Sequence, residues 1–285
     1  MSKNYRAELV GVIGDPVDGN PTGVMEEAGF AALGLNFRYL TIKVLPQDLE
    51  DAIRGVRAFH MRGINLTMPH KVQVIPYLDE LTEAAGIIGA VNTVINQDGK
   101  LIGENTDGKG FMIALKNEGI PVKGTHITML GAGGAAKAIA VECALAGASE
   151  IKIINRDKTR GVALAELITS RTGCTAEYIP WTEKKTVPAD TNILINGTSA
   201  GLFPDIDMCP DLDYATIHEG MTVCDVVFNP VDPLFLQKSR ANGARTVNGI
   251  GMLVNQGAMN FRLWTGREAP VDVMYKTLEA EFSEE

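Results

Sequence analysis

Residues 127–140, with the sequence ITMLGAGGAAKAIA, constrain the fold more than any other part of the chain. An apolar run leads into glycines, and residues that favour a helix follow at once. Gly131, Gly133 and Ala136 fit the pattern G-x-G-x-x-G/A. The first glycine allows a tight turn, the second lets a pyrophosphate approach the backbone, and the small third residue lets the helix pack on the strand. The pattern predicts a strand, a phosphate-binding turn and a helix whose N-terminal amides face the phosphates.

A second apolar run, residues 150–155, supports this interpretation because it ends in Arg156 and Asp157. In a dinucleotide-binding unit, the side chain that reads the ribose stands about 20 residues after the glycines, at the end of the second strand. The alternative is a glycine-rich turn in an α/β layer that binds no ligand. We expect a dinucleotide to bind here, with Gly131, Ala132, Gly133, Gly134, Ala135, Asn155, Arg156 and Asp157 among its contacts.

Length and charge limit the class of protein. At 285 residues the chain is long enough for two hydrophobic cores, because single cores rarely grow beyond about 250 residues. The net charge of −9, without clusters of lysine or arginine, argues against nucleic acid or an anionic membrane as a partner. The four cysteines and four histidines lack metal-ligand spacing, so we expect neither a metal site nor a disulfide framework. With no signal-peptide pattern and no long apolar run, we expect a cytoplasmic protein.

The first 108 residues alternate strand and helix patterns, which predicts an α/β unit with a mostly parallel sheet. The expected strands are residues 7–14, 37–44 and 63–67, and the expected helices are residues 24–33, 49–59 and 81–86. A β-hairpin is expected from residue 90 to 103, with its turn at Gln97, Asp98 and Gly99.

The rest of the chain continues the alternation around the glycine turn. Further helices are expected at 110–118, 160–171, 252–265 and 271–282, and further strands at 176–179, 193–198, 222–228 and 245–248. We therefore expect an α/β protein of two domains. Residues 1–108 and the C-terminal helices in 249–285 form the first, and residues 109–248 form a doubly wound dinucleotide-binding domain.

Several stretches together resemble the shikimate and quinate dehydrogenase family, and above all its quinate/shikimate dehydrogenase branch. The resemblance covers nearly the whole chain. The motifs that carry it are MRGINLTMPHK (61–71), GAVNT (89–93), ENTDG (104–108), GAGGA (131–135), NR (155–156), NGT (196–198), FNP (228–230) and GMLVNQ (251–256). The family implies an N-terminal substrate domain, a Rossmann-like nicotinamide domain, and hydride transfer between NAD(P) and a ring hydroxyl or carbonyl of shikimate, quinate or a related cyclic hydroxy acid.

Lys71 and Asp107 are the catalytic residues that the resemblance implies. Oxidation of a secondary alcohol requires a group that takes the hydroxyl proton while hydride leaves to the nicotinamide, and a lysine beside a carboxylate can do this. On the family pattern Lys71 transfers the proton, and Asp107 holds its ammonium and the reacting hydroxyl.

The substrate-binding residues that the resemblance implies are Thr67, Asn92 and Gln256, whose hydroxyl and amides suit a polyol ring. A turn-forming Asn92 and a surface Gln256 are the structural alternatives. Tyr39 matches a tyrosine at the edge of the site, although core packing explains a strand tyrosine equally well. Asn65 is expected to be structural.

The chain departs from the family where the substrate carboxylate is usually bound. A His-Ser-x-Ser-Pro segment is common there, but Asn20 and Thr22 replace both serines in GDPVDGNPTG (14–23). An amide and a hydroxyl still donate to a ligand, and a glycine at position 23 loosens the turn. Phe228 stands where the family often has a ligand-binding tyrosine. We therefore expect the hydride chemistry to be retained and substrate recognition to differ, with a cyclitol-like substrate as one alternative.

The cofactor site is expected to extend to Thr198, Phe228 and Gly249. At the ribose end Arg156 resembles a clamp on the 2′-phosphate of NADP, whereas the carboxylate of Asp157 repels a phosphate, so NAD is favoured and NADP tolerated. Arg156 stacking on adenine is a further alternative. The other functions left open are folate- or tRNA-linked chemistry on a similar fold, and a nicotinamide-binding regulatory protein. A homodimer is one possibility for the assembly.

Overall fold

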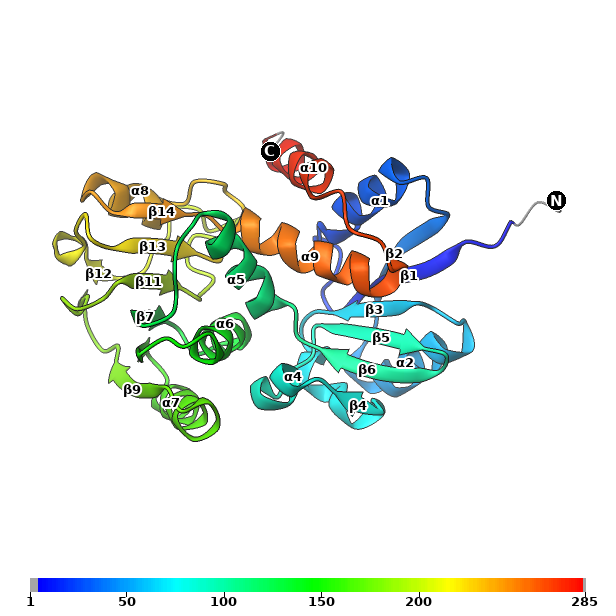
Figure 1. The fold of residues 1–285 in the computed structure, drawn as a ribbon, viewed down its shortest axis with the longest axis horizontal. Helices are drawn as coiled ribbons and strands as arrows, with labels where there is room; N and C mark the ends of the chain where they lie inside the picture. The colour runs from blue at the N-terminus through cyan, green and yellow to red at the C-terminus, as the bar shows by residue number, and fades with distance from the viewer. Residues whose placement is uncertain (1–4, 284–285) are drawn as a thin grey trace. The chain divides into compact units, whose positions relative to one another are not determined.

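The computed structural model of the protein describes residues 5–283, which divide into two compact units. The first unit runs to Thr106 and takes in the chain again from Val254, and the second covers Asp107–Leu253. Each unit has its own sheet and its own hydrophobic cores (Figure 1).

The sheet of the first unit has six strands in the order β2-β1-β3-β5-β6-β4. They are β1 (Glu8–Gly14), β2 (Phe37–Lys43), β3 (Gly63–Leu66), β4 (Glu80–Leu81), β5 (Thr93–Gln97) and β6 (Lys100–Glu104). β1 lies parallel to both β2 and β3, and β5 and β6 form the predicted antiparallel hairpin. Asp98 and Gly99 in its turn have φ of 51° and 97°, as a two-residue hairpin turn requires.

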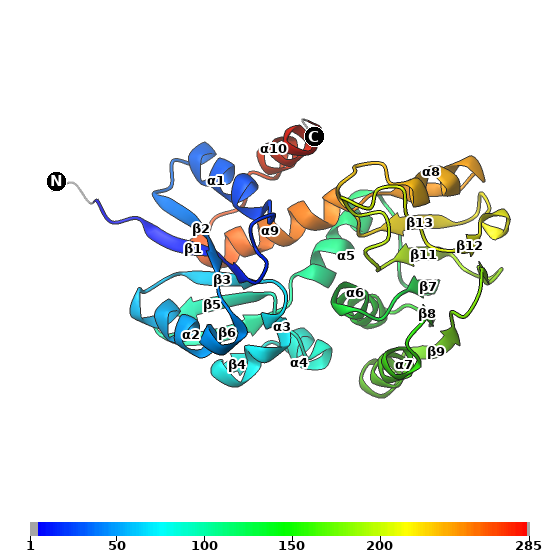
Figure 2. The ribbon, with the colours of Figure 1, turned by 180° about the vertical axis from the view of Figure 1, so that it is seen from behind.

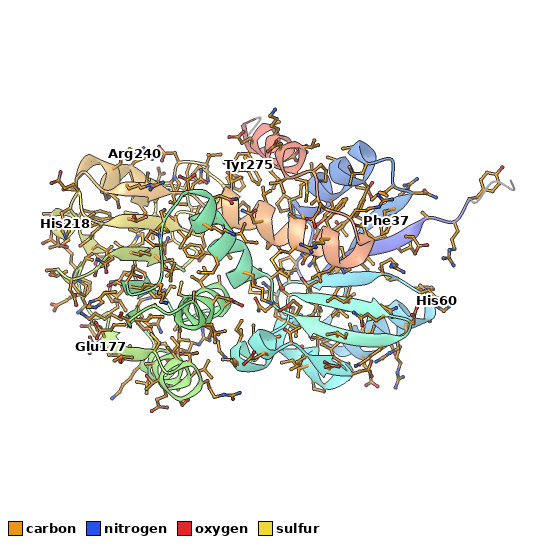
Figure 3. The ribbon with its side chains drawn as sticks, viewed as in Figure 1. Phe37, His60, Glu177, His218, Arg240 and Tyr275 are labelled. Carbon is orange, nitrogen blue, oxygen red and sulfur yellow. The ribbon has the colours of Figure 1, made fainter. Side chains whose placement is uncertain are left out.

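Helices cover this sheet: α1 (Thr22–Ala32), α2 (Leu49–Ala58), the short α3 (His70–Gln73), α4 (Glu83–Ile88), the later part of α9 (Ile250–Thr265) and α10 (Val271–Ser283). Single 3-10 turns occupy Pro46–Asp48 (η1) and Ile75–Tyr77 (η2). On one side, aromatic rings from α1, β2 and α9 form the core, which includes Phe37 (labelled in Figure 3). The Phe30 ring lies 5.1 Å from Phe37 and 5.2 Å from Phe261. This packing ties the C-terminal helices to the N-terminal strands.

The sheet of the second unit has six parallel strands in the order β14-β13-β11-β7-β8-β9 (Figure 2). They are β7 (His126–Leu130), β8 (Glu150–Asn155), β9 (Thr175–Pro180), β11 (Ile193–Asn196), β13 (Thr222–Asp225) and β14 (Arg245–Val247). Strands β8 and β9 follow β7 toward one edge of the sheet. The chain then returns to β11, which pairs with the other side of β7, and β13 and β14 continue toward the opposite edge. The order therefore reverses between β7 and β11, where doubly wound sheets bind their ligands. The short strands β10 (Lys185–Thr186) and β12 (Leu212–Asp213) pair separately.

The helices of the second unit are α5 (Asp107–Asn117), α6 (Gly134–Leu145), α7 (Lys158–Thr172) and α8 (Leu234–Ala241), with one 3-10 turn, η3 (Tyr214–Thr216). Helix α6 is rich in alanine, and seven of its side chains are buried. Small side chains let this helix approach the sheet closely, which brings its N-terminus near the ends of β7 and β11.

The predicted fold class, a two-domain α/β protein with a doubly wound sheet, is confirmed. Some boundaries differ. The strand expected over 222–228 ends at Asp225, and α8 was not predicted, because short irregular segments around Pro230 and Pro233 obscure its pattern. The compact units change at 106/107 and 253/254, where the sequence predicted 108/109 and 248/249. Helix α5 starts earlier than predicted, and Met252 in the first turn of α9 packs into the core of the second unit. None of the described helices is long and apolar enough to cross a membrane.

Candidate functional site

In the first unit, two segments meet at the carboxyl ends of β1 and β3. The amide of Asp15 donates to the carbonyl of Met68 at 3.0 Å. A Cβ on Gly14 would lie 2.2 Å from Cγ2 of Thr67, so only glycine lets the two segments come this close. Predicted substrate residue Thr67 is thereby placed at the same strand edge as the turn that carries Asn20. Ligands of open α/β sheets bind at such edges.

Lys71 lies on the four-residue helix α3, and its backbone is held on two sides. Its carbonyl accepts a hydrogen bond from the Val91 amide at 2.7 Å. The buried ring of His70, the residue before it, lies 2.7 Å through Nε2 from the Val44 carbonyl oxygen. These two anchors place Lys71 beside the residue that precedes Asn92, so two predicted functional residues come together within this unit.

Asn92 is a buried hub of hydrogen bonds. Its Oδ1 accepts from the Thr106 amide at 2.8 Å, and its Nδ2 donates to Thr106 Oγ1 at 3.0 Å and to Gln256 Oε1 at 3.5 Å. Asn92 and Gln256, 164 residues apart in sequence, are therefore in direct contact. Gln256 is only 7% exposed, so it does not have the surface position that its structural alternative supposed, whereas the bonds of Asn92 to Thr106 also fit a residue that stabilises the hairpin.

Asn260 completes this cluster and was not predicted from the sequence. Its Oδ1 accepts from the hydroxyls of Thr93, at 2.9 Å, and Thr106, at 3.0 Å, and its Nδ2 donates to Gln256 Oε1 at 3.3 Å. Asn260 stands four residues after Gln256 on α9, so the two share a helix face. That spacing is the signal that could have identified it.

Tyr39 connects to the same cluster through Asn65. The Tyr39 hydroxyl donates to Asn65 Oδ1 at 2.9 Å, and Asn65 Nδ2 donates to the Asn92 carbonyl at 3.1 Å and to Thr93 Oγ1 at 3.0 Å. Tyr39 also packs near Trp264, with ring centroids 6.4 Å apart. It therefore serves as a core residue and as a member of the polar network, and Asn65 orients the network as a structural residue does.

Thr22 and Asn20, in place of the two serines, lie at the start of α1. The Thr22 amide donates to Asn20 Oδ1 at 3.0 Å, which fixes the turn before the helix. The Thr22 side chain is buried, and its hydrogen bond with Tyr39 acts to lower the pKa of that phenol. Burial, followed by the nearby Glu26, outweighs this bond and raises the pKa of Tyr39 well above its usual range. Thr22 therefore joins the polar network directly.

In the second unit, the predicted phosphate turn has the geometry that the sequence pattern requires. Gly131 has a φ of 98°, which glycine adopts without strain, and its amide donates to the Ile154 carbonyl at 2.8 Å. A Cβ on Gly133 or on Gly134 would meet no atom within 4 Å. Protein packing therefore does not require these two glycines, and the open space before α6 leaves room for a pyrophosphate at its N-terminus.

Strand β11 supports this turn from the other side of the switch point. Asn196 Oδ1 accepts from the Thr198 amide at 3.1 Å and from its hydroxyl at 2.7 Å. A Cβ on Gly131 would lie 2.9 Å from Cγ2 of Thr198, and one on Gly197 would lie 2.7 Å from Cβ of Ala136. The predicted cofactor residues Gly131 and Thr198 are thus in contact.

At the tip of β8, the carboxylate of Asp157 is engaged in the following helix. Asp157 is the N-cap of α7, because its Oδ1 accepts from the Arg160 amide at 3.0 Å and its Oδ2 lies 3.6 Å from Arg160 Nε. Asn155 Nδ2 donates to the Asp157 carbonyl at 2.7 Å. Arg156 and Lys158 are exposed beside it. The carboxylate that was expected to read the ribose already has partners within the helix.

The remaining predicted residues lie at ends of elements. Gly249 precedes α9, and its amide donates to the Val227 carbonyl at 3.1 Å; a Cβ there would lie 2.4 Å from the same oxygen. Phe228 follows in the same segment and is half-buried. Asp107 is the buried first residue of α5. Since Lys71 and Asp107 belong to different units, their pairing stays a prediction.

One group of possible metal ligands is found among the described residues, at the amino ends of β7 and β8, away from the phosphate turn. It consists of His126, Glu150 and Asp190. Lys152 Nζ lies 2.7 Å from Asp190 Oδ2 and 3.2 Å from Glu150 Oε2. Because an ammonium already neutralises these carboxylates, the group is an ion-pair network.

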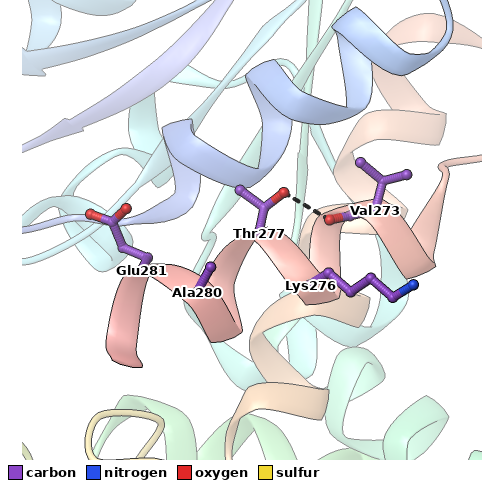
Figure 4. A pocket seen from close by; sticks show the side chains of 5 residues that line it. All are labelled: Val273, Lys276, Thr277, Ala280 and Glu281. Carbon is purple, nitrogen blue, oxygen red and sulfur yellow. Dashed lines mark hydrogen bonds between the residues drawn. The ribbon is translucent and has the colours of Figure 1, made fainter. Parts of the chain in front are cut away.

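Two surface hollows lie among described residues other than these. One of about 500 Å³ runs along a single face of α10 and is lined by Val273, Lys276, Thr277, Ala280 and Glu281 (Figure 4). The Thr277 hydroxyl there donates to the Val273 carbonyl at 2.8 Å, within the helix. Another, of about 510 Å³, lies at the end of α5 and is mostly apolar. Neither brings together groups suited to proton or hydride transfer.

Comparison with known proteins gives consistent matches. Residues 12–94 match the family model for the shikimate dehydrogenase substrate binding domain, and residues 249–279 match that for the shikimate 5′-dehydrogenase C-terminal domain. Shikimate dehydrogenase (NADP(+)) of Desulforamulus reducens is 41% identical over 280 residues, 96% of each chain.

Two solved structures extend this likeness. A ligand-free 5-ketofructose reductase of Gluconobacter sp. strain CHM43 is 44% identical with a TM-score of 0.94, over 98% of this chain and 100% of that chain. A quinate dehydrogenase from Corynebacterium glutamicum in complex with NAD is 29% identical with a TM-score of 0.89, over 96% and 99% of the two chains.

Proposed function

This chain belongs to the shikimate dehydrogenase family of NAD(P)-dependent oxidoreductases that act on a CH–OH donor, and we propose that it prefers a neutral polyhydroxylated substrate over a carboxylate. The predicted reaction, hydride transfer between NAD(P) and a ring hydroxyl or carbonyl of shikimate, quinate or a related compound, is confirmed for the family. Membership also decides against folate- and tRNA-linked chemistry. The choice of substrate within the family is our proposal.

The observation that carries this proposal is the charge of the segment around Asn20 and Thr22. Residues 7–37 contain five acidic residues, Glu8, Asp15, Asp18, Glu26 and Glu27, and no lysine, arginine or histidine. Two of them form salt bridges with cations outside this segment, Glu8 with Arg6 at 3.0 Å and Asp15 with Lys43 at 3.4 Å. A substrate carboxylate placed beside Asp15, Asp18 or Glu27 would be repelled, and no cation of this segment would compensate.

The hydrogen-bonding groups of the segment point to the same substrate class. The Thr22 hydroxyl bonds with Tyr39, and Asn20 Oδ1 accepts the Thr22 amide. The polar network of amides and hydroxyls around Asn92 both donates and accepts, as a ring or ketose with several hydroxyls requires. The likeness to a reductase of 5-ketofructose, a polyhydroxy ketone without a carboxylate, supports this choice.

Shikimate or quinate is the second candidate. Asn92 and Gln256, which the family uses for ring hydroxyls, are in contact as a hydroxyl-binding pair should be. Relatives near 40% identity are named for shikimate. Under this candidate, Asn20 and Thr22 would donate to the carboxylate from a changed turn.

For either substrate, we assign proton transfer to Lys71 and its support to Asp107. The nicotinamide, when bound, accepts or supplies the hydride. Lys71 takes the proton of the hydroxyl that is oxidised and returns it in the reverse direction, and Asp107 keeps the ammonium in place. Thr67, Asn92 and Gln256 orient the ring. Tyr39 orients Thr22 and Asn65.

For the cofactor, we propose that NADP is preferred and NAD accepted. The chain uses a nicotinamide cofactor, and relatives are named for NADP or solved with NAD. The expectation that Asp157 favours NAD weakens because this carboxylate caps α7 and faces Arg160, leaving a surplus of positive charge from Arg156 and Lys158 for a 2′-phosphate. We assign the pyrophosphate to residues 131–135 and the α6 N-terminus. A homodimer and a cytoplasmic location stay predictions.

The test is a substrate panel with purified protein, followed by absorbance of the reduced cofactor. Reduction of 5-ketofructose with NADPH and with NADH is compared with oxidation of shikimate and of quinate at saturating NADP and NAD. The proposal expects kcat/KM for the neutral substrate to exceed that for either acid by at least about tenfold, as one lost charge interaction would give. Higher kcat/KM for shikimate or quinate would establish the second candidate. Absence of turnover with the whole panel would favour a regulatory, nicotinamide-binding protein.

A further inference from the structure

Glu26 is a buried carboxyl group that the reaction described so far does not use. It lies on α1, four residues after Thr22, so the two side chains share a face of the helix. Glu26 is 0% exposed, and neither of its side-chain oxygens has a hydrogen-bond partner among the described residues. Buried polar atoms are nearly always paired, so two unpaired oxygens on one side chain require an explanation.

The surroundings of Glu26 connect it with the substrate-binding residues of the same unit. Glu26 Oε1 lies 3.4 Å from the place where a Cβ on Gly257 would be, and Gly257 follows Gln256 on α9. On the β2 side it acts on Tyr39, whose hydroxyl enters the polar network. Glu26 therefore lies between Thr22, Tyr39 and the helix turn that carries Gln256. Like Glu26, these residues are buried, with exposed fractions of 5% for Thr22, 8% for Tyr39 and 7% for Gln256.

The charge state of Glu26 follows from this burial. Burial, and then the carboxylate of Glu27, raises the pKa of Glu26 well above its usual range. The titratable groups that face it are Tyr39 from β2 and Glu27 from its own helix, and α9 contributes Gly257 there. None of these is a cation. Burial without a cation therefore favours the neutral carboxylic acid, which can donate one hydrogen bond and accept others.

We propose that the Glu26 carboxyl determines substrate selectivity by hydrogen-bonding to hydroxyl groups of a neutral polyhydroxylated substrate, at the end of the site marked by Thr22. This inference rests on the proposed function and names the residue responsible for it. A carboxylic acid that donates to one hydroxyl and accepts from its neighbour matches a vicinal diol. The substrate would satisfy the two oxygens that lack partners.

A substrate carboxylate would have a different effect at this place. It could lie beside Glu26 only while Glu26 keeps its proton, because two adjacent carboxylates repel. Binding of the anion would therefore weaken as pH rises, whereas binding of a neutral analogue would change much less. Selectivity for the neutral compound should increase with pH, and a purely structural Glu26 would not produce this effect.

The test uses two ligands that differ in this charge and in one methyl group, shikimate and its methyl ester. Their dissociation constants are measured by calorimetry on cofactor-saturated protein between pH 6 and pH 9, for wild type, Glu26→Gln and Glu26→Leu. In wild type we expect the ester to bind more tightly than shikimate. The ratio of the shikimate Kd to the ester Kd should increase by about tenfold from pH 6 to pH 9. Glu26→Gln, which keeps size and hydrogen bonding but cannot ionise, should bind the ester within about threefold of wild type and make the ratio independent of pH. Glu26→Leu should weaken ester binding by about tenfold.

Asp48→Asn is the matched control, because it removes an exposed charge of the same unit that lies outside residues 7–37 and should leave the ratio and its pH dependence unchanged. Wild type that binds both ligands equally at every pH, or binds neither, overturns the inference. A Glu26→Gln protein whose Kd ratio depends on pH as in wild type also overturns the inference. This comparison can be made even if Glu26→Leu does not fold. The proposed function fails separately, on the wild-type kcat/KM values of the substrate panel alone.

Discussion

The side chains of Asn196 and Asp225 join the ends of two neighbouring strands of the nicotinamide domain. They are register partners on β11 and β13, and Asn196 Nδ2 donates to Asp225 Oδ1 at 2.9 Å. Asn196 in turn accepts from the amide and hydroxyl of Thr198, which contacts the phosphate turn at Gly131. Asp225 thereby orients the predicted cofactor residue Thr198 through Asn196.

Protonation of Asp225 should make stability depend on pH. Burial raises the pKa of Asp225 to about 7, against the lowering effect of hydrogen bonds from Val227, Asn196 and Val226. The folded protein then holds this proton more tightly than the unfolded chain. The bound proton therefore stabilises the folded state. This contribution to the free energy of unfolding is complete below about pH 4 and is lost as the pH rises to about 7, by about 4 kcal/mol at most.

We predict that Asp225→Asn removes this decline. The asparagine keeps the acceptor for Asn196 and places an uncharged group where Asp225 Oδ2 has no hydrogen-bond partner within residues 5–283. Urea denaturation at pH 4, 5.5 and 7 should give a wild-type free energy of unfolding that falls more steeply with pH than the variant's. Equal slopes for both proteins would contradict the assignment, and Asp205→Asn, on an exposed loop, serves as the control.

Gly133→Ala should separate cofactor binding from folding. Gly133 has a φ of −81°, which alanine adopts easily, and its Cβ would meet no protein atom within 4 Å. We expect Tm to stay the same or rise slightly, since alanine restricts the unfolded chain. The added methyl group would occupy the space assigned to the pyrophosphate, so the Kd for NADP should rise at least about tenfold.

The control for this prediction is Gly86→Ala, at another glycine with open space, on α4 of the substrate domain. Its Tm should respond in the same way and its Kd for NADP should not change. An unchanged Kd in Gly133→Ala, measured by quenching of tryptophan fluorescence or by calorimetry, would remove the pyrophosphate from this turn.

The sequence predicted the doubly wound sheet because each strand there is a short apolar run next to a helical pattern, and the glycines mark the first turn. It placed Gly131 and Thr198 in one site for the same reason. It did not find Asn260 or Glu26, since a single polar residue on an amphipathic helix looks like a surface residue. Their burial depends on contacts with strands more than 150 residues away for Asn260, and on the packing of α1 against its neighbours for Glu26.

The role of Asp157 shows a second limit of the sequence. A carboxylate after the second strand suggests ribose binding, but the same residue type is a preferred helix N-cap. Sequence spacing fits both roles, and only the 3.0 Å bond to the Arg160 amide shows that the cap is formed.

Asn260→Ala should destabilise the substrate domain. Its Oδ1 accepts from the hydroxyls of Thr93 and Thr106, and all three residues are fully buried. Removing the amide leaves two hydroxyls and Gln256 without this partner, at a cost of about 2 to 4 kcal/mol. Urea denaturation should show this loss, while Asn242→Ala, whose side chain is exposed on the other domain, should cost less than about 1 kcal/mol. A loss as small as that of the control would mean that water or a rearranged Gln256 replaces the amide.

Lys71→Ala should lose most turnover and still bind cofactor. Removing the group that transfers the proton is expected to lower kcat by about 10² to 10⁴-fold, while Kd for NADP stays within about twofold because the phosphate turn belongs to the other domain. Stopped assays under saturating substrate and cofactor give kcat, and calorimetry gives the Kd. Lys276→Ala, an exposed lysine on α10, is the control. Turnover that persists in Lys71→Ala would refute the catalytic role.

Asp157→Asn should shift cofactor preference further toward NADP without changing stability. Asparagine caps a helix as well as aspartate does, so the bond to the Arg160 amide and the Tm should both remain. Loss of the negative charge removes its repulsion of a 2′-phosphate and should lower KM for NADP by about three- to tenfold. KM for NAD should change by less than about twofold if Asp157 is only a cap, and should rise if it also binds the ribose hydroxyls.

Arg156→Ala should act in the opposite direction and raise KM for NADP by about tenfold with little effect on NAD, because a guanidinium next to the phosphate is lost. Parallel changes for both cofactors in either variant would show that this strand tip does not distinguish them.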